Sequence, residues 1–370
     1  VEGELGYGVA AKDIILATVP VLEEHGVAIT TVFYKRMFEA HPELLNIFNE
    51  ANQAKGRQQS ALAMMVYEAA KHIDNLEAIV PQVMLVAHKH RSLTVQPEHY
   101  PIVGKYLLLA IQEVLGDAAT PDIMQAWEET YGVIANIFID VERQLYEASA
   151  WEDFKPFIVK KKEVESELVT SFYLEPKDGL PLPTYEAGQY ITVRLHTGDE
   201  YLANRQYTIS CAPNGQTFRI SVKREPGGRV SNYLHDHVQV GDELEVTAPA
   251  GDFYLEEAER ITLLSAGVGI TPMMAMAEAA RGQVDFIHTS KSKAVQPFAS
   301  ILPNVVEEGV YIYTDESPRI DERVLRDYVH NGTYYICGPE GFMRDMKEAL
   351  LQQGVTEDQI RIEYFGPAIA

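Results

Sequence analysis

The sequence predicts a multidomain fold: an all-α domain, then an antiparallel β-barrel, then an α/β domain on a parallel sheet. Three successive patterns along the chain predict it. Apolar residues recur three and four positions apart between about residues 12 and 148, which is typical of helices. Short alternating runs separated by turn residues follow from residue 154. After residue 260 strands alternate with helices, which indicates parallel strands.

The length and charge of the chain bound its class. It has 370 residues and a formal charge of −23, and this length suits two or three domains that each bury a core. The acidity argues against nucleic acid or an anionic membrane as a partner. Cys211 and Cys337 are far apart, so we expect free thiols in a reducing, cytoplasmic setting. We find no membrane-spanning stretch, and we expect residues 1–8 to be a flexible or non-native end.

The all-α domain is expected over residues 1–148. Prolines at positions 42, 97 and 121 each suit the first turn of a helix. The first of these helices is short and ends near Phe48, and the last is long, from residue 123 to residue 148. Another helix is expected over about residues 76–91. The first two apolar stripes are formed by Ile15, Val19 and Leu22, and by Ile29, Val32, Phe33 and Met37.

The β-barrel is expected over residues 149–259 and the α/β domain over residues 260–370. The barrel strands are predicted at residues 157–159, 168–172, 190–195, 206–209 and 218–222. The α/β strands are predicted at residues 261–264, 284–288, 310–313, 334–336 and 360–363, with helices at 272–280 and 342–352. A parallel sheet of this kind binds its ligand at the carboxyl ends of the strands.

Two motifs of the α/β domain follow strands. In Ser265–Pro272, glycines turn a strand into a helix, and such a turn offers backbone N–H groups to a phosphate. In Tyr335–Phe342, a thiol and a glycine–proline turn end another strand. Taken alone, the glycines also suit close packing, and Cys337 also suits a core thiol.

The barrel carries two further motifs. Arg205-Gln206-Tyr207-Thr208 lies on a strand, where an arginine can pair with a diphosphate and a tyrosine ring can lie on a flat cofactor. Lys223–Ser231 brings glycines and then a serine to the start of a short helix at residues 232–235, which suits an anion. The strand motif alone would read equally well as an ordinary exposed strand.

These four motifs, in this order, resemble the ferredoxin–NADP reductase superfamily. The resemblance implies FAD and NAD(P)H as cofactors, with an aromatic closing segment over the flavin. The implied flavin contacts are Tyr190, Arg205, Gln206, Tyr207, Thr208, Gly228, Ser231, Tyr364, Phe365, Gly366 and Pro367. The implied nicotinamide contacts are Gly267, Val268, Gly269, Ile270, Thr271, Pro272, Cys337, Gly338 and Pro339. Tyr364 stands where relatives often carry a smaller residue.

Two histidines, His88 and His90, lie in one helix of the first domain, and periodicity alone does not choose between them. The wider pattern resembles a bacterial globin. It consists of Phe33-Tyr34, Pro42-x5-Phe48, Gln58, Ala87-His88-Lys89-His90 and Pro97-Glu98-His99-Tyr100. A globin followed by flavin and nicotinamide domains resembles the flavohaemoglobin family over about residues 12–370.

The resemblance implies haem b with its iron held by His90. It places Phe48 on the porphyrin, Leu62 as an apolar wall, and Tyr34 and Gln58 beside bound dioxygen. It pairs His90 with Glu142 and Tyr100, and puts Lys89 and Glu363 near a haem–flavin interface. Without the resemblance, Glu142 would read as a solvated helix position and Tyr34 as a core aromatic.

The implied activity is NAD(P)H-dependent nitric oxide dioxygenation by a cytoplasmic monomer acting on small molecules. An oxygen or nitric oxide binding or sensing protein is one alternative, although storage needs no continuous electron supply. A hydroperoxide reductase is another. Lys291 and Lys293 follow the second strand of the α/β domain, where they suit the 2′-phosphate of NADPH or a solvated basic loop equally well.

Overall fold

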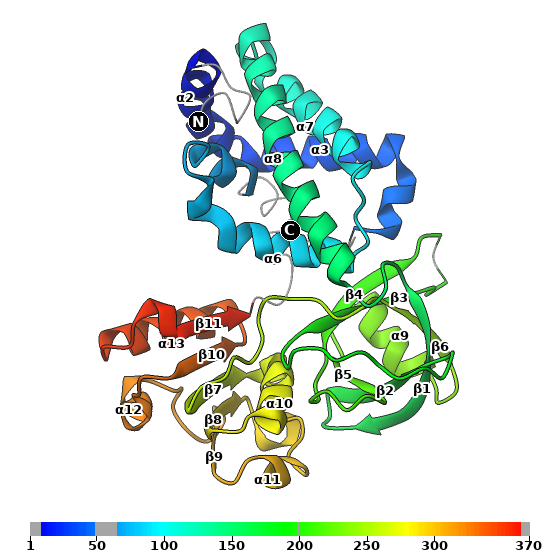
Figure 1. The fold of residues 1–370 in the computed structure, drawn as a ribbon, viewed down its shortest axis with the longest axis vertical. Helices are drawn as coiled ribbons and strands as arrows, with labels where there is room; N and C mark the ends of the chain where they lie inside the picture. Colours follow the sequence, from blue (N-terminus) through cyan, green and yellow to red (C-terminus); the bar gives the residue numbers. More distant parts are fainter. Residues whose placement is uncertain (1–8, 49–64, 199, 364–370) are drawn as a thin grey trace. The chain divides into compact units, whose positions relative to one another are not determined.

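The computed structural model describes residues 9–48, 65–198 and 200–363. These residues form two compact units. The first runs as far as Asp153 and includes the short segment Gly198–Asn204, and the second comprises Phe154–Thr197 and the chain from Arg205 onward. The first unit is helical, whereas the second contains an antiparallel and a parallel sheet (Figure 1), which confirms the predicted fold class.

Short turns and prolines delimit the elements of the helical unit. Thr120 caps the longest helix, because its side chain accepts a hydrogen bond from the Ile123 amide. The elements are α2 (Val9–Glu24), α3 (Gly26–Ala40), η1 (Pro42–Asn46), η2 (Leu76–Ile79), α6 (Val80–Ser92), α7 (His99–Leu115), η3 (Gly116–Ala118) and α8 (Pro121–Ala148). In the described ranges no single helix is long and apolar enough to cross a membrane; α2 and α3 reach that threshold only as a pair bent by 85°.

Three of the predicted helices differ from the described ones. The helix expected over residues 76–91 is divided into η2 and α6. Pro81 lies in the first turn of α6, and because proline has no backbone N–H, it cannot donate the hydrogen bond that would continue the preceding 3₁₀ helix. The short helix from Pro42 is a 3₁₀ helix that ends at Asn46, before Phe48. The next helix begins at His99, two residues after Pro97.

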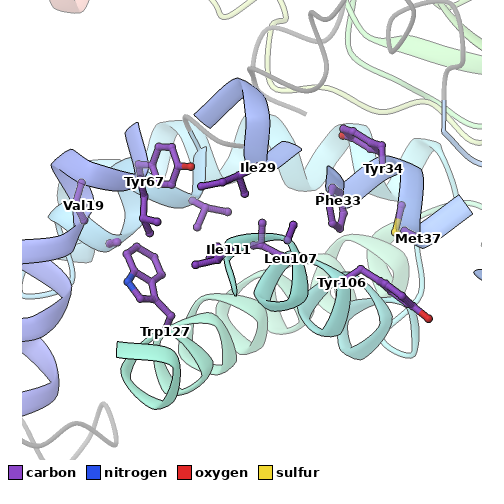
Figure 2. Close-up of a cluster of buried hydrophobic side chains, with 14 of the residues drawn as sticks. Val19, Ile29, Phe33, Tyr34, Met37, Tyr67, Tyr106, Leu107, Ile111 and Trp127 are labelled. Carbon is purple, nitrogen blue, oxygen red and sulfur yellow. The ribbon is translucent and has the colours of Figure 1, made fainter. Parts of the chain in front are cut away.

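The core of the helical unit joins α2, α3, α7 and α8 through their apolar stripes. Figure 2 shows Phe33 between Leu107 and Met37, with Trp127 at the far end of the cluster. Trp127 is almost fully buried and donates its indole hydrogen to Thr18 Oγ1 over 2.8 Å, so its one polar group is satisfied. Tyr34 lies at the edge of this cluster in Figure 2.

The antiparallel sheet of the second unit has six strands in the order β4-β3-β6-β1-β2-β5. A bridge between Ile209, which directly follows β4, and Ile220 within β5 joins the two edge strands into the predicted barrel. The strands are β1 (Lys155–Val164), β2 (Val169–Pro176), β3 (Tyr190–Leu195), β4 (Ala203–Thr208), β5 (Phe218–Lys223) and β6 (Glu243–Val246). The sequence does not predict β6, because its four residues alternate two exposed glutamates with two buried apolar residues, which is too short a pattern to indicate a strand.

The parallel sheet has the order β11-β10-β7-β8-β9. Neighbouring residues of one strand serve opposite cores: Leu263 packs with α10 and Leu264 with α13. Its strands are β7 (Arg260–Ala266), β8 (Gln283–Ser290), β9 (Gly309–Tyr313), β10 (Thr333–Cys337) and β11 (Ile360–Glu363). The helices of this unit are α9 (Arg229–His237), α10 (Ile270–Ala279), α11 (Leu302–Val305), α12 (Glu322–Leu325) and α13 (Glu340–Gln352).

Candidate functional site

The helical unit contains an apolar cavity lined by side chains from α3, α6, α7 and α8. Most of its lining is aliphatic or aromatic, which excludes water and suits a flat apolar ligand. The polar side chains at its wall are Tyr34, His90, His99, Tyr100 and Tyr131.

Three side chains from different helices meet beside this cavity. His90 Nδ1 lies 2.8 Å from Glu142 Oε1 and 3.1 Å from the Tyr100 hydroxyl. Tyr100 donates its hydroxyl hydrogen to the same carboxylate oxygen over 2.6 Å. Because a carboxylate can only accept, Nδ1 carries the hydrogen, and Nε2 is the ring nitrogen left to coordinate a metal.

Glu142 lies on the amphipathic helix α8, yet it exposes only 3% of its surface. It therefore does not occupy the solvated position that periodicity alone favoured. Burial and then the Glu142 carboxylate raise the pKa of Tyr100, so the tyrosine hydroxyl stays protonated and keeps donating. The carboxylate is thus held by two hydrogen bonds.

Tyr131 and Phe138 also line the cavity, and the sequence analysis did not single them out. Tyr131 donates to the Tyr100 carbonyl over 2.6 Å, and Phe138 lies 6.1 Å from the His90 ring between centroids. Both share one stripe of α8 with Glu142, because Phe138 follows Tyr131 by seven residues and Glu142 follows Phe138 by four. That spacing was the sequence feature that could have indicated them.

Tyr34 lies on α3 and exposes 5% of its surface. Its ring stacks on Phe38 with centroids 5.7 Å apart, and Phe38 in turn meets Phe48 edge to face at 6.1 Å. Burial raises the pKa of Tyr34, so the hydroxyl is available as a donor at neutral pH. Tyr34 and Phe48 both line the cavity.

The other histidine on α6 has different surroundings. His88 is half-buried, it is not among the residues lining this cavity, and burial lowers its pKa to about 4. Lys89 is buried on the same helix, whereas Glu363 is buried in the other compact unit. Gln58, Leu62 and the closing segment 364–367 lie outside the described residues.

The predicted flavin motif, Arg205–Thr208, lies entirely on β4. Arg205, Gln206 and Tyr207 are half-buried, and Thr208 is buried. Burial raises the pKa of Tyr207, which keeps its hydroxyl protonated. The ring of Tyr190 on β3 packs against the backbone of Gly251. A side chain at position 251 would collide with it, because a Cβ on Gly251 would lie 2.8 Å from the tyrosine ring.

The glycine–serine motif forms a tight turn into α9. Gly228 is the N-cap residue, and a Cβ there would lie 2.6 Å from Ser231 Oγ. Ser231 Oγ accepts a hydrogen bond from the Glu225 amide over 3.0 Å, which fixes the serine over the first helical turn. Backbone N–H groups at such a helix start suit a phosphate.

The two nicotinamide motifs meet at the carboxyl edge of the parallel sheet. Register pairs Cys337 at the end of β10 with Ser265 near the end of β7. Gly267 has a φ of +57°, and a Cβ on Gly269 would overlap the Cys337 carbonyl. The chain therefore needs glycine at both positions to turn and to pack.

Cys337 is fully buried and pairs in register with Glu363 of β11. Burial, and then the Glu363 carboxylate, raise the pKa of the Cys337 thiol, so it is neutral at physiological pH. A neutral, buried thiol of this kind is a poor nucleophile, so Cys337 contributes by packing its polarisable sulfur against its neighbours. Lys291 and Lys293 are exposed just after β8.

A histidine with a buried carboxylate partner beside an apolar cavity suits haem, and the two glycine turns of the second unit suit nucleotide phosphates. Residues 31–138 match the globin family, and residues 156–254 match the oxidoreductase FAD-binding domain family. The chain is 48% identical to a flavohemoprotein of Halalkalibacterium halodurans, with 96% of each chain covered. It is 45% identical to a flavohemoprotein of Bacillus subtilis, with 97% of each covered.

Solved structures of related proteins have the same fold as this chain or as its second unit. A flavohemoglobin of Malassezia yamatoensis, with bound FAD and haem, superposes with a TM-score of 0.89 at 32% identity and covers 97% of this chain and 99% of its own. The FAD/NAD-binding domain of a nitric oxide dioxygenase of Vibrio cholerae has a TM-score of 0.54 at 38% identity, covering 58% of this chain and all of its own.

The chain belongs to the flavohemoprotein family, as its resemblance to flavohaemoglobins implied. It is an NAD(P)H-dependent haem oxidoreductase, and the predicted cofactors haem, FAD and nicotinamide nucleotide are confirmed at this level. Its ligands are small molecules.

Proposed function

We propose that this chain is a nitric oxide dioxygenase, which converts nitric oxide to nitrate with dioxygen and NAD(P)H. The observation that carries the proposal is the His90–Glu142–Tyr100 cluster beside an apolar cavity that Tyr34 also lines. A related FAD/NAD domain from Vibrio cholerae belongs to a protein named nitric oxide dioxygenase, which supports the same activity here.

In this proposal His90 holds the haem iron through Nε2, and bound haem supplies one-electron chemistry and a site for dioxygen. Glu142 and Tyr100 fix the orientation of the imidazole and make it a stronger electron donor, because a carboxylate takes up part of the Nδ1 hydrogen's charge. The apolar walls, Phe48 among them, keep water from the reacting groups.

Tyr34 acts as a hydrogen-bond donor toward an anionic ligand in the cavity. Burial keeps its hydroxyl protonated, and a hydrogen bond to a charged group stabilises by about 1.5–3 kcal/mol. A hydrogen bond of that strength would favour retention of an anionic ligand in the cavity by about tenfold or more. Gln58 is proposed to assist from the part of the chain outside the described residues.

The second unit supplies the electrons. Arg205 and Ser231 are proposed to hold the FAD diphosphate, with Tyr190, Tyr207 and Thr208 at the flavin ring. The glycine turn from Gly267 and the Cys337 turn are proposed to hold the nicotinamide nucleotide at the sheet edge. A flavin is required because a two-electron donor must serve a one-electron acceptor.

The test is turnover of the aerobic, fully loaded protein with nitric oxide and NADH. The balance 2 NO + 2 O₂ + NADH → 2 NO₃⁻ + NAD⁺ + H⁺ requires two nitrate ions for each NADH consumed. A flavin that NADH reduces, without consumption of nitric oxide, would contradict the proposal and favour a binding or sensing role. Faster turnover with an organic hydroperoxide would instead favour the hydroperoxide reductase.

A further inference from the structure

We propose that Arg219, Glu278 and Phe298 form a clamp that positions the nucleotide-binding sheet against the flavin barrel for hydride transfer. The inference concerns the reductase reaction of the family. It does not depend on which oxidant the haem uses.

Arg219 is a buried cation at the seam where the barrel closes. It lies on β5, and its side chain is 6% exposed. Its Nε donates to Ser210 Oγ over 2.9 Å, its Nη2 donates to the Ser210 carbonyl, and the Ser210 amide donates back to the Arg219 carbonyl over 2.7 Å. Ser210 follows Thr208 by two residues, so these bonds fix the end of the proposed flavin strand.

Two further contacts of Arg219 come from the nucleotide-binding part of the second unit, in addition to the Tyr173 ring of β2 at 6.0 Å. Glu278 near the end of α10 places Oε1 3.4 Å from Arg219 Nη2, and its Oε2 accepts from the Ala212 amide over 3.0 Å. The Phe298 ring, from the segment between β8 and α11, lies 5.0 Å from the guanidinium carbon. One guanidinium therefore binds two segments of the nucleotide-binding part by an ion pair and a cation–π contact.

Phe298 has a backbone conformation that is rare for a bulky residue. Its φ is +63° and its side chain is fully buried. Its carbonyl accepts from the amides of Ile301 and Leu302, so the bend also starts α11. A bulky residue keeps a left-handed backbone only where the surrounding contacts outweigh the strain. The contact with Arg219 is one of those contacts.

The clamp acts through α10, which is ten residues long. Its first turn follows Gly267–Gly269, and Glu278 lies near its other end, so holding Glu278 to the barrel sets the position of the glycine turn. In the reaction, a hydride with its electron pair leaves nicotinamide C4 and bonds to flavin N5, giving NAD⁺ and reduced flavin. The rate of this transfer falls steeply when nicotinamide C4 and flavin N5 are displaced from each other, because misplacement of about 1 Å can cost about a hundredfold.

Glu278→Gln in the full, cofactor-loaded chain tests the clamp. Glutamine keeps an oxygen acceptor for Ala212 and removes the charge that Arg219 binds, and position 278 is exposed, so the variant should fold. We expect the anaerobic flavin-reduction rate constant at saturating NADH to fall about tenfold. We also expect the nicotinamide–flavin charge-transfer absorbance to weaken, with the FAD and NADH dissociation constants changed less than about twofold. Arg219→Lys should lower the rate constant further, because lysine cannot form the flat contact with Phe298.

Glu245→Gln is the matched control. Glu245 pairs with Arg194 at 2.8 Å across β6 and β3, entirely within the barrel. This variant should leave flavin reduction and the charge-transfer absorbance unchanged. The clamp is contradicted if Glu278→Gln also leaves both unchanged, if Glu245→Gln lowers them equally, or if Glu278→Gln releases FAD in parallel with the loss of rate.

Discussion

At the scale of single residues, the candidate site is built from groups whose protonation state is fixed by their neighbours. His90 must carry its hydrogen on Nδ1 because Glu142 accepts it. Tyr100 stays protonated because burial and the same carboxylate raise its pKa. His90 Nε2 is therefore the nitrogen that can bind the haem iron, and the Glu142 carboxylate is the buried negative charge behind it.

Glu142→Gln should weaken electron donation by His90 while keeping the shape of the side chain. Partners of metal-bound histidines typically contribute about 10–100-fold, so we expect nitric oxide turnover to fall within that range. The iron–histidine stretching frequency, measured by resonance Raman spectroscopy, should fall as well. Tyr100→Phe keeps the carboxylate and should cost less; an equal loss, or no shift in frequency for Glu142→Gln, would contradict this role.

Lys291 and Lys293 are exposed at the carboxyl edge of the parallel sheet, next to the end of β8. If they bind the 2′-phosphate of NADPH, changing both to alanine should lower kcat/KM for NADPH about tenfold relative to NADH, because a charged hydrogen bond is lost. Steady-state reduction of an artificial acceptor with either nucleotide measures this ratio. An unchanged ratio would assign the lysines to a solvated loop.

His288 should make the stability of the second unit sensitive to acid. It is fully buried, its Nδ1 and Nε2 lie 2.7 and 2.9 Å from the hydroxyls of Ser265 and Ser290, and burial lowers its pKa to about 3. The unfolded chain takes up this proton near pH 6.5 and the folded chain does not. The stabilisation is therefore complete above pH 6.5 and is lost toward pH 3, by about 1.4 kcal/mol per pH unit.

His288→Gln isolates that contribution, because all other titrating groups remain. We expect its thermal midpoint to fall less than that of the unchanged chain when the pH is lowered from about 7 to about 5. Equal losses in the two proteins would show that His288 is protonated in the folded state or is not the group responsible.

At the scale of elements, the sequence predicted strands and helices wherever the apolar period was strong. The strand over residues 190–195 and the helix over residues 342–352 illustrate this. It did not predict β6, where glutamates interrupt the apolar pattern, or the break at Pro81. These features depend on packing and on local proline geometry more than on periodicity.

In the candidate site, too, local features were predicted and long-range contacts were not. Motifs within one strand-to-helix turn, such as Gly267–Gly269, were readable because their chemistry is local. Tyr131, Phe138 and Arg219 were not singled out, because their partners are distant in sequence and come from other elements. Periodicity places such residues in a core, but it does not indicate which of them meet.

Gly269→Ala should disrupt the nicotinamide edge of the sheet. Its Cβ would overlap backbone atoms of Cys337, which cannot move aside as a side chain could, so α10 and β10 must separate. We expect the KM for NADH to rise about tenfold or more while FAD affinity is retained. An unchanged KM would mean that this close approach does not form the nucleotide site.

Gly132→Ala is the matched glycine control. Gly132 lies within α8, and its Cβ would meet nothing within 4 Å. Because alanine is more favourable than glycine in a helix interior, this variant should be more stable than the unchanged chain by about 0.5–1 kcal/mol. Its KM for NADH should be unchanged.

At the scale of the whole molecule, the chain combines a two-electron donor site with a one-electron haem site. A protein that only stores or senses a gas needs no continuous reduction, whereas this chain carries an oxidoreductase FAD-binding domain in addition to its globin domain. Under the proposed activity the protein therefore turns over continuously, because NAD(P)H would reduce the haem again after each nitric oxide is oxidised.

Isotope labelling tests that claim most directly. The loaded protein is supplied with nitric oxide, NADH and ¹⁸O₂, and the nitrate is analysed by mass spectrometry. Dioxygenation predicts that both added oxygen atoms of each nitrate are ¹⁸O and that one NADH is consumed for every two nitrate ions. Nitrite as the main product, or nitrate that carries fewer than two ¹⁸O atoms, would contradict it.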